Sequence, residues 1–285
     1  MRHITNLDLT EYNSYRITAH CDNAFFPENE EDLIFLYNNR KGTPKILLGN
    51  GNNVILSKEF YPEDFIIFNG NFDKIQITKN VVHAEAGATL EQISLLALEH
   101  KLTGFEIFYD IPSSVGGAIV MNAGAGGEEI KDCLVKVRYL DLEDLQVKER
   151  QNQEIGFSYR DSFFQNTPST IVLGAEFILK SGDQKKIQAK MEEVKKTRWA
   201  KQPREFPNCG SVFKRPAGRF VGPMLDELGL KGFTIGGAKI SEKHSGFIVN
   251  TGNATGKGIL DIITVVQERV KEIFGIELEV EQRII

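Results

Sequence analysis

The chain has 285 residues, of which 41% are hydrophobic and 26% charged, and its net charge is -5 at neutral pH. This length allows two or three packed units, and the composition is that of an ordinary globular protein. The negative charge argues against generic nucleic-acid binding, the longest apolar runs are too short to cross a bilayer, and the charged N-terminus shows no secretory signal.

Glycine-rich turns separate the elements expected in the first part of the chain. Residues 46–56, "ILLGNGNNVIL", predict a strand, a loop and a second strand. Another strand begins at Val81, and Thr89 with Gln92 forms a capping-box pattern that predicts the start of a helix. Gly104 follows closely enough to help end that helix.

The middle of the chain changes character twice. Residues 111–129 are too rich in glycine for regular structure and too apolar for a solvent-exposed loop. This indicates that the backbone here closely approaches another group. Residues 133–142 largely alternate between apolar and polar, and this predicts a strand. A charged helix is expected over 183–200, and we place the main domain boundary there. Its apolar residues fall on one side: Ile187, Met191 and Val194.

The C-terminal part again mixes helices and strands. We expect a short helix near 221–228 ended by Gly229, a strand at 246–250 and a long helix closed by Gly275. The tail, residues 276–284, alternates and predicts a strand. One face would hold Ile276, Leu278 and Val280, and the other Glu277, Glu279, Glu281 and Arg283. The interleaved elements indicate an α/β or α+β protein.

Two glycine-rich loops are candidates for cofactor binding. The "GNGNN" loop offers several backbone N–H groups to a phosphate, although a simple hairpin turn is the favoured explanation of this loop by itself. The segment "IPSSVGGA" adds two serine hydroxyls and a glycine pair about sixty residues on. Together they suggest an extended anionic cofactor lying across both loops. The motifs of Rossmann, P-loop, G-x-S-x-G and H-E-x-x-H proteins are absent.

Three isolated residues could contact a ligand or serve structure alone. Arg160 lies among aromatic residues, where it would either pair with Asp161 or bind an anionic ligand. Glu281 is either a solvent-facing residue of the tail or part of a site. His244 is either a surface histidine or a ligand contact.

The segment 207–216, "PNCGSVFKRP", places three chemically distinct groups side by side. Cys209 has no histidine nearby to activate it, so a small buried thiol is the better interpretation. Ser211 is either a turn residue or a proton donor. The three cysteines are widely spaced, which indicates a reducing cytoplasm and no zinc site. Five cations at 195–204 mark a solvated helix end or a local anion site.

In their order and spacing these motifs resemble those of the UDP-N-acetylenolpyruvoylglucosamine reductase (MurB) family, in its shorter subtype. The matching stretches cover nearly the whole chain: "YNSYRI", "LLGNGNNVIL", "AEAGATLEQI", "GFEIFYDIPSSVGGAIVMNAGA", "FSYRDSFF", "QPREFPNCGSVFKRPAG", "LGLKGFTIGGAKISEKHSGFIVN" and "LEVEQRI".

The resemblance implies a fold and an activity. The fold would be α+β, with a vanillyl-alcohol-oxidase-like FAD-binding domain of two α/β subdomains, residues 1–80 and 81–182, and a C-terminal α/β substrate domain, residues 183–285. NADPH would reduce a non-covalent FAD, which would reduce UDP-N-acetylglucosamine enolpyruvate to UDP-N-acetylmuramate. Such a flavoprotein oxidoreductase would work in the cytoplasm in peptidoglycan synthesis, and so in cell wall biogenesis, cell shape and cell division.

The resemblance also implies which residues form the site. Arg160, Ser211 and Glu281 would be catalytic, with Ser211 as the proton donor and the C-terminal strand returning Glu281 to the active site. Arg215 and His244 would contact the substrate, and no metal is implied. The FAD-binding residues would be Gly49, Asn50, Gly51, Asn52, Asn53, Pro112, Ser113, Ser114, Gly116, Gly117, Asn122 and Gly124.

Three positions depart from the family's usual pattern. Ser113 stands where the family has glycine, Asn52 where it has serine, and Gly126 where it has tyrosine. All three lie in the FAD-binding half, whereas the catalytic matches are intact, which favours an active enzyme. The alternatives are another flavin oxidase or dehydrogenase of the same fold, and a sugar-nucleotide-binding relative without turnover.

Overall fold

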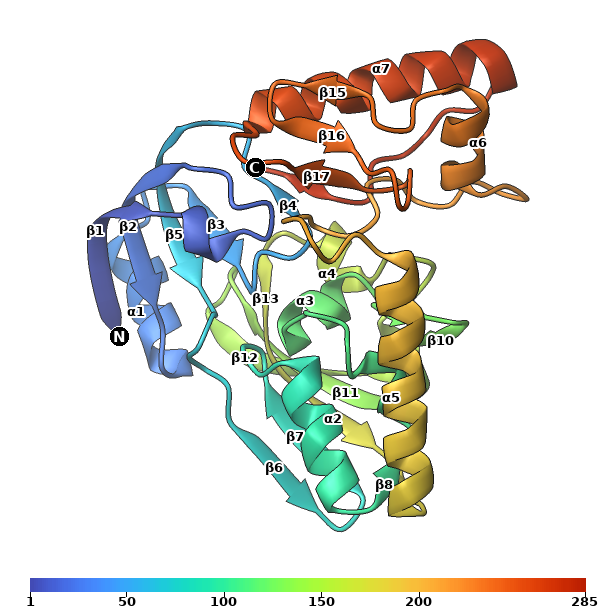
Figure 1. The fold of residues 1–285 in the computed structure, drawn as a ribbon. Coiled ribbons are helices and arrows are strands. Elements are labelled where there is room, and N and C mark those ends of the chain that lie inside the picture. The colour runs from blue at the N-terminus through green and yellow to red at the C-terminus, as the bar shows by residue number, and fades with distance from the viewer. The chain divides into compact units, whose positions relative to one another are not determined.

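The computed structural model describes all 285 residues and shows a mixed α+β fold (Figure 1). The helices are α1 Glu30–Asn39, α2 Leu90–Glu99, α3 Val115–Val120, α4 Phe163–Asn166, α5 Gln184–Lys201, α6 Val221–Glu227 and α7 Gly256–Phe274. The strands of the first half are β1 Arg2–Asp8, β2 His20–Phe26, β3 Lys45–Leu48, β4 Val54–Ile55, β5 Phe60–Ile67, β6 Ile75–Thr78, β7 Val81–Glu85, β8 Leu102–Thr103, β9 Gly124–Ala125 and β10 Glu128–Glu129. Those of the second half are β11 Leu134–Asp141, β12 Gln146–Gln151, β13 Thr170–Ile178, β14 Lys180–Ser181, β15 Thr234–Ile235, β16 Ala238–Ile240, β17 Ile248–Asn250 and β18 Arg283–Ile284.

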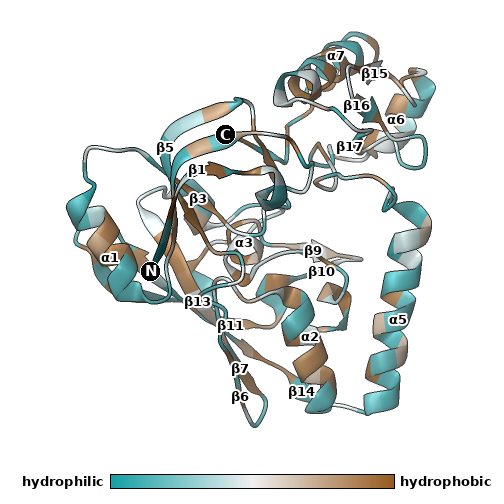
Figure 2. Cartoon of the chain, turned by 60° about the vertical axis from the view of Figure 1, so that its left-hand side comes forward, coloured by the Kyte–Doolittle hydropathy of each residue, from teal (hydrophilic) through white to brown (hydrophobic).

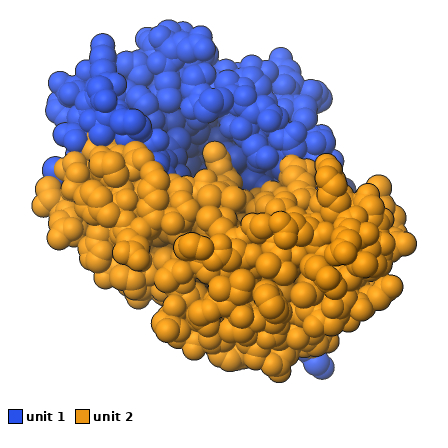
Figure 3. All heavy atoms as spheres, turned by 90° about the horizontal axis from the view of Figure 1, so that it is seen from above, with its two compact units in different colours: residues 1–3, 25–50, 65–198 blue, residues 4–24, 51–64, 199–285 orange.

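The chain divides into two compact units whose residues alternate along the sequence (Figure 3). Unit 1 comprises residues 1–3, 25–50 and 65–198, and unit 2 comprises residues 4–24, 51–64 and 199–285. Strands β1, β2 and β5 of the four-stranded sheet β1-β2-β5-β3 have residues in both units. The expected domain limits at 80 and 182 stay a prediction.

Unit 1 is built around a five-stranded antiparallel sheet in the order β12-β11-β13-β7-β6. Helix α3 packs on β7 and β13, and Leu90 and Ile93 of α2 belong to the same apolar core as Val82 of β7. Helix α5 is hydrophilic over most of its surface (Figure 2), and Ile187 and Met191 are its buried residues, as its apolar spacing predicts. The strand predicted at 133–142 is confirmed as β11.

The start of α2 is confirmed, but the predicted role of Gly104 at its end is wrong. The hydroxyl of Thr89 accepts the backbone N–H of Gln92 at 3.1 Å, and the Gln92 side chain accepts the backbone N–H of Thr89 at 2.8 Å. The helix ends at Glu99, and β8 separates it from Gly104. Lys101, with φ of 56°, takes the left-handed conformation that a glycine would otherwise supply.

The prediction that 111–129 lacks regular structure is also wrong, because α3, β9 and β10 lie there. Ser114 begins α3, since its hydroxyl accepts the backbone N–H of Gly117 at 3.3 Å. A Cβ on Gly116 would lie 3.3 Å from the Cβ of Ala86, just after β7. The glycines therefore let this short helix approach the sheet closely.

Unit 2 contains the three-stranded sheet β15-β16-β17, on which α7 packs. The glycines after its two helices have the predicted left-handed conformation, with φ of 66° at Gly229 and 67° at Gly275. Neither unit has a helix with the length and apolar character needed to cross a membrane.

The strand predicted for the tail at 276–284 is confirmed only at its end. Strand β18 is short and runs parallel to β4, and Val280 forms a single bridge with Phe213. Burial still alternates, since Leu278 is buried between two exposed glutamates. No continuous strand lies beside this segment. Its backbone instead makes separate hydrogen bonds, such as the 2.9 Å bond from the N–H of Lys214 to the carbonyl of Glu279.

We expect Thr89→Ala to lower the free energy of unfolding by about 1 kcal/mol, because it removes the side-chain acceptor in the first turn of α2. Urea unfolding followed by circular dichroism measures the change. Thr264→Ala is the matched control, since the exposed Thr264 hydroxyl donates to the Leu260 carbonyl within α7. Equal stabilities for the two variants would contradict the capping role.

Candidate active site

The turn at Cys209–Ser211 lies in unit 2 and exposes Ser211. Gly210 has φ of 78°, a conformation that side-chain-bearing residues rarely adopt. Ser211 pairs with Phe247 in an isolated antiparallel bridge, and the N–H of Val212 donates to the carbonyl of Gly246 at 3.0 Å. The turn is thus fixed from one side while the serine stays accessible.

The C-terminal tail fixes the same turn from the other side. The N–H of Glu281 donates to the carbonyl of Val212 at 2.8 Å, so the backbone of Glu281 lies beside that of Ser211. The Asn53 side chain donates to the Glu281 carbonyl at 3.2 Å, and the carbonyl of Asn53 accepts the N–H of Arg283 at 2.9 Å. Unit 2 therefore brings together the predicted residues Ser211, Glu281 and Asn53.

Gln282 is not among the predicted site residues, yet it is only 3% exposed. Its side-chain oxygen accepts the Tyr15 hydroxyl at 2.9 Å. Its amide nitrogen lies 3.1, 3.3 and 3.4 Å from three backbone carbonyls, those of Cys209, Gly210 and Ser211. Gln282 continues the inward face of the alternating tail, and a polar residue at this apolar position was the signal that could have found it.

Cys209 is a buried thiol, as predicted. Its sulfur donates to the carbonyl of Val54 at 3.3 Å, and burial raises the pKa of the thiol to about 12. Burial likewise raises the pKa of Cys21 to about 11 and that of Cys133 to about 12. Because the thiolate is the nucleophile, none of the three is placed for covalent chemistry at neutral pH.

Arg160 lies in unit 1 against the glycine-rich segment that follows α3. Its guanidinium donates to the carbonyls of Asn122 at 3.3 Å and Gly124 at 2.9 Å. Arg160 and Asn122 both have left-handed backbones, with φ of 55° and 42°, and the Asn122 side chain donates to the carbonyl of Ser158 at 2.9 Å. A predicted catalytic residue and two predicted cofactor-binding residues therefore meet within unit 1.

The predicted cofactor-binding residues fall in both units. Unit 1 holds Gly49, Asn50, Pro112, Ser113, Ser114, Gly116, Gly117, Asn122 and Gly124, and unit 2 holds Gly51, Asn52 and Asn53. Within unit 1 the two loops touch, because a Cβ on Gly49 would lie 2.5 Å from the Ser114 hydroxyl oxygen. Within unit 2 a Cβ on Gly51 would lie 2.0 Å from the Tyr12 carbonyl oxygen. Gly51 therefore requires glycine, because its neighbour is backbone and its φ is 65°, whereas a side chain at Gly49 would displace the Ser114 hydroxyl.

Two side-chain oxygens in these loops indicate that the residues fit FAD. The Oδ1 atoms of Asn52 and Asn122 are buried and have no hydrogen-bond donor within the protein. An unsatisfied buried acceptor costs about 1–3 kcal/mol, and a ligand with N–H or O–H donors, as FAD has, would remove that cost. The departure at Asn52 keeps a role in the loop, since its amide nitrogen donates to the Ser14 hydroxyl at 2.5 Å.

The two predicted substrate-contacting residues both lie in unit 2. The Arg215 guanidinium lies 4.6 Å from the centre of the Phe220 ring. His244 is half-buried, its Nδ1 accepts the N–H of Gly246 at 3.1 Å, and its ring packs against Phe247 at 4.8 Å. Burial lowers the pKa of His244, so this imidazole is neutral at neutral pH.

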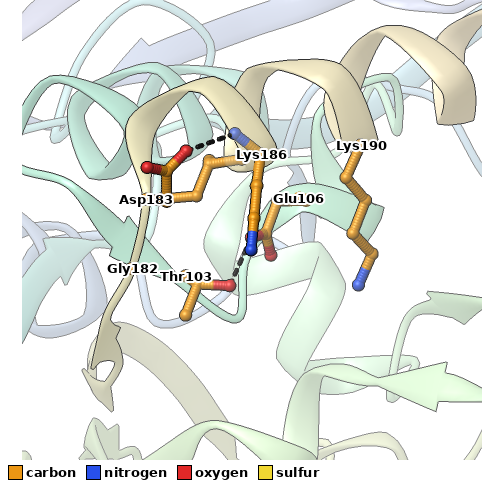
Figure 4. A pocket seen from close by; sticks show the side chains of 7 residues that line it. Thr103, Glu106, Gly182, Asp183, Lys186 and Lys190 are labelled. Atoms are coloured by element: carbon orange, nitrogen blue, oxygen red, sulfur yellow. Dashed lines mark hydrogen bonds between the residues drawn. The ribbon is translucent and has the colours of Figure 1, made fainter.

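A further pocket lies at the start of α5 in unit 1 (Figure 4). The carboxylate of the buried Glu106 accepts the Thr103 hydroxyl and, at 2.8 Å, the N–H of Gly104. Asp183 caps α5 by accepting the N–H of Lys186 at 3.0 Å. None of the predicted site residues lines this pocket, and its acids are bonded within the protein, so we assign it no catalytic role. No group of three metal-ligating side chains is found anywhere in the chain.

Comparisons with known proteins identify the family of the chain. The chain matches a model for an FAD binding domain over residues 22–147 and a model for the UDP-N-acetylenolpyruvoylglucosamine reductase C-terminal domain over residues 202–285. It is 41% identical to the UDP-N-acetylenolpyruvoylglucosamine reductase of Francisella tularensis, over 98% of this chain and 99% of the relative. Its identity to the reductase of Caldanaerobacter subterraneus is 43%, over 98% of this chain and 92% of the relative.

A solved structure shows the same fold. The crystal structure of UDP-N-acetylenolpyruvylglucosamine reductase (MurB) from Thermus caldophilus matches with a TM-score of 0.84 and 31% identity, covering 99% of this chain and 98% of that one. The fold and the loops therefore define an FAD-dependent oxidoreductase. The chain belongs to the UDP-N-acetylenolpyruvoylglucosamine reductase family. The predicted α+β fold class, family and FAD cofactor are confirmed.

We expect all three thiols to resist alkylation by iodoacetamide at pH 8 in the native protein. With pKa values of about 11 to 12, fewer than roughly one thiol in a thousand is ionised at this pH, and all three are buried. Mass spectrometry counts the labelled cysteines, and urea-unfolded protein, which should label three times, is the control. Rapid labelling of native Cys209 would contradict its packing role.

Proposed function

We propose that this chain uses NADPH to reduce UDP-N-acetylglucosamine enolpyruvate to UDP-N-acetylmuramate, a peptidoglycan precursor, in the cytoplasm. The observation that carries the proposal is the 2.8 Å bond from the N–H of Glu281 to the carbonyl of Val212. It places an acidic residue from the end of the chain next to an accessible serine. A proton donor and a polarising group are what the second half of this reduction requires.

The two glycine loops would hold the cofactor. Asn52 and Asn122 would supply acceptors from their unpartnered Oδ1 atoms, and the loop glycines would let the backbone approach. When bound, FAD supplies hydride transfer from NADPH to the enolpyruvyl group.

Ser211 would deliver the proton. Reduction of the enolpyruvyl double bond adds a hydrogen to each carbon, and the carbon next to the carboxylate receives its hydrogen as a proton. A serine hydroxyl is a weak acid in water, so it serves only a strongly basic, enol-like carbon at close range. The exposure of Ser211, on a turn fixed from two sides, supports this role.

Arg160 and Glu281 would polarise the substrate's carboxylate and the developing enol. A guanidinium binds a carboxylate through two parallel N–H donors and stabilises negative charge that builds up there. Arg215 and the neutral His244 would contact the sugar nucleotide. Within the basic segment 195–204, Arg198 is engaged by Asp110 at 3.0 Å, so this cation has a structural partner.

We expect Gly49→Ala to weaken FAD binding about tenfold, or about 1.4 kcal/mol. The added methyl would lie 2.5 Å from the Ser114 hydroxyl oxygen and force it away from the N–H of Gly117. Titration of the apoprotein with FAD, followed by flavin fluorescence, measures the affinity. Gly42→Ala is the control, because no atom lies within 4 Å of its added methyl. An affinity equal to that of the control would contradict a role for this loop.

We expect Ser211→Ala to leave reduction of the flavin by NADPH unchanged. Its reoxidation by the enolpyruvyl substrate should slow by about 10²- to 10⁴-fold, the usual range for loss of a general acid. Stopped-flow absorbance of the flavin follows both half-reactions separately. Cys209→Ser is the matched control two residues away, since its hydroxyl can still donate to the Val54 carbonyl and both half-reactions should persist. Normal reoxidation in Ser211→Ala would rule out the proton-donor role.

A further inference from the structure

We propose that Gln282 is a positioning residue that holds Ser211 and Glu281 in register for the reaction. The inference rests on the proposed function, because it assigns to Gln282 the task of placing the two groups that act on the substrate. It is carried by the contacts of the Gln282 amide within unit 2.

The amide nitrogen of Gln282 faces an unusual concentration of carbonyls. The carbonyl oxygens of Cys209, Gly210 and Ser211 lie 3.1, 3.3 and 3.4 Å from it. Three successive carbonyls of an extended chain point in alternating directions, so they can converge only because Gly210 turns the backbone at φ of 78°. The amide is therefore a shared donor that holds the serine turn in this shape.

The other end of the amide is anchored so that it has one orientation. Carbonyl oxygens only accept hydrogen bonds, so the NH₂ group must face them and the side-chain oxygen must face the Tyr15 hydroxyl, 2.9 Å away. Burial raises the pKa of Tyr15 well above its usual range, which keeps this hydroxyl a donor. The Asn250 side chain donates to the Tyr15 carbonyl at 2.8 Å and fixes Tyr15 in turn.

The same short segment also sets the place of Glu281. Neighbouring side chains of an extended segment point to opposite sides, so burying Gln282 directs Glu281 the other way. The N–H of Glu281 bonds the carbonyl of Val212, the residue after the turn. The backbone of the proton donor and that of the acid are thus fixed to each other by two adjacent residues, one through its side chain and one through its N–H.

The experiment compares Gln282→Met and Tyr15→Phe with Gln267→Met. Misplacement by about 1 Å can cost about 100-fold in rate. We expect Gln282→Met to slow flavin reoxidation by the enolpyruvyl substrate about 10- to 100-fold, with the KM for that substrate little changed and flavin reduction by NADPH intact. Tyr15→Phe should show a smaller loss in the same step. Gln267 is the matched control because its amide donates at 2.8 Å to Leu278 in the same tail.

Two further readouts separate positioning from simple stability. Hydrogen exchange should show faster exchange of the Val212 and Glu281 amides in Gln282→Met and no change there in Gln267→Met. In Gln282→Glu, an ionised carboxylate would face the carbonyls, whereas the protonated acid can donate to one of them. Burial beside carbonyls raises a carboxyl pKa. Reoxidation in this variant should therefore recover as pH falls, relative to the unmodified protein at the same pH.

The proposal is overturned if Gln282→Met reoxidises at the normal rate, or if it slows both half-reactions equally. It is likewise overturned if neither amide exchanges faster. If Gln282→Met does not fold, Tyr15→Phe and the pH profile of Gln282→Glu test the positioning role in its place. Normal reoxidation in Ser211→Ala would instead overturn the proposed function, whereas loss in that variant with normal Gln282→Met overturns the positioning role alone.

Discussion

The hydrogen bond from the N–H of Glu281 to the carbonyl of Val212 is the interaction on which the site in unit 2 depends. It joins Val212 and Glu281, which are 69 positions apart in the chain, and so brings the serine turn and the C-terminal tail together. The bond is supported on both sides, by the Phe213–Val280 bridge and by the Asn53 contact with the Glu281 carbonyl. A hydrogen bond is worth only about 1 kcal/mol net, so the register comes from several such bonds acting together.

The glycines of the two loops show how much of a binding motif is dictated by the protein's own packing. Glycine is required at position 51, where a side chain would meet the Tyr12 carbonyl, and at position 49 a side chain would displace the Ser114 hydroxyl. The segment after Ile111 has enough glycine to suggest a loop, yet it forms α3 because Gly116 can approach Ala86. The glycine pattern that indicates a cofactor loop therefore also reflects close packing, and the Oδ1 atoms of Asn52 and Asn122 are the buried acceptors of these loops that lack a donor within the protein.

Polar residues that lie close together in the sequence differ in their burial. Cys209 and Ser211 stand two residues apart, and the thiol is buried with a raised pKa whereas the serine is exposed. Gln282 and Glu281 are neighbours, and the amide is buried whereas the acid is not. Alternation along an extended chain accounts for Glu281 and Gln282, which are neighbours. Cys209 and Ser211 are two residues apart, and they differ in burial because Gly210, with φ of 78°, turns the backbone between them.

The sequence by itself determined the elements with strong local signals: the capped start of α2, the helix α7 with its closing glycine, and strand β11. Its motif order also indicated the family and the candidates Arg160, Ser211 and Glu281. Local sequence signals failed where a contact distant in sequence determines the structure. In α3, Gly116 packs against Ala86, and the tail lacks a continuous partner strand. Only the tertiary structure decided that Gln282 holds the serine turn, because periodicity can place this residue on the inward face but cannot show which carbonyls its amide meets.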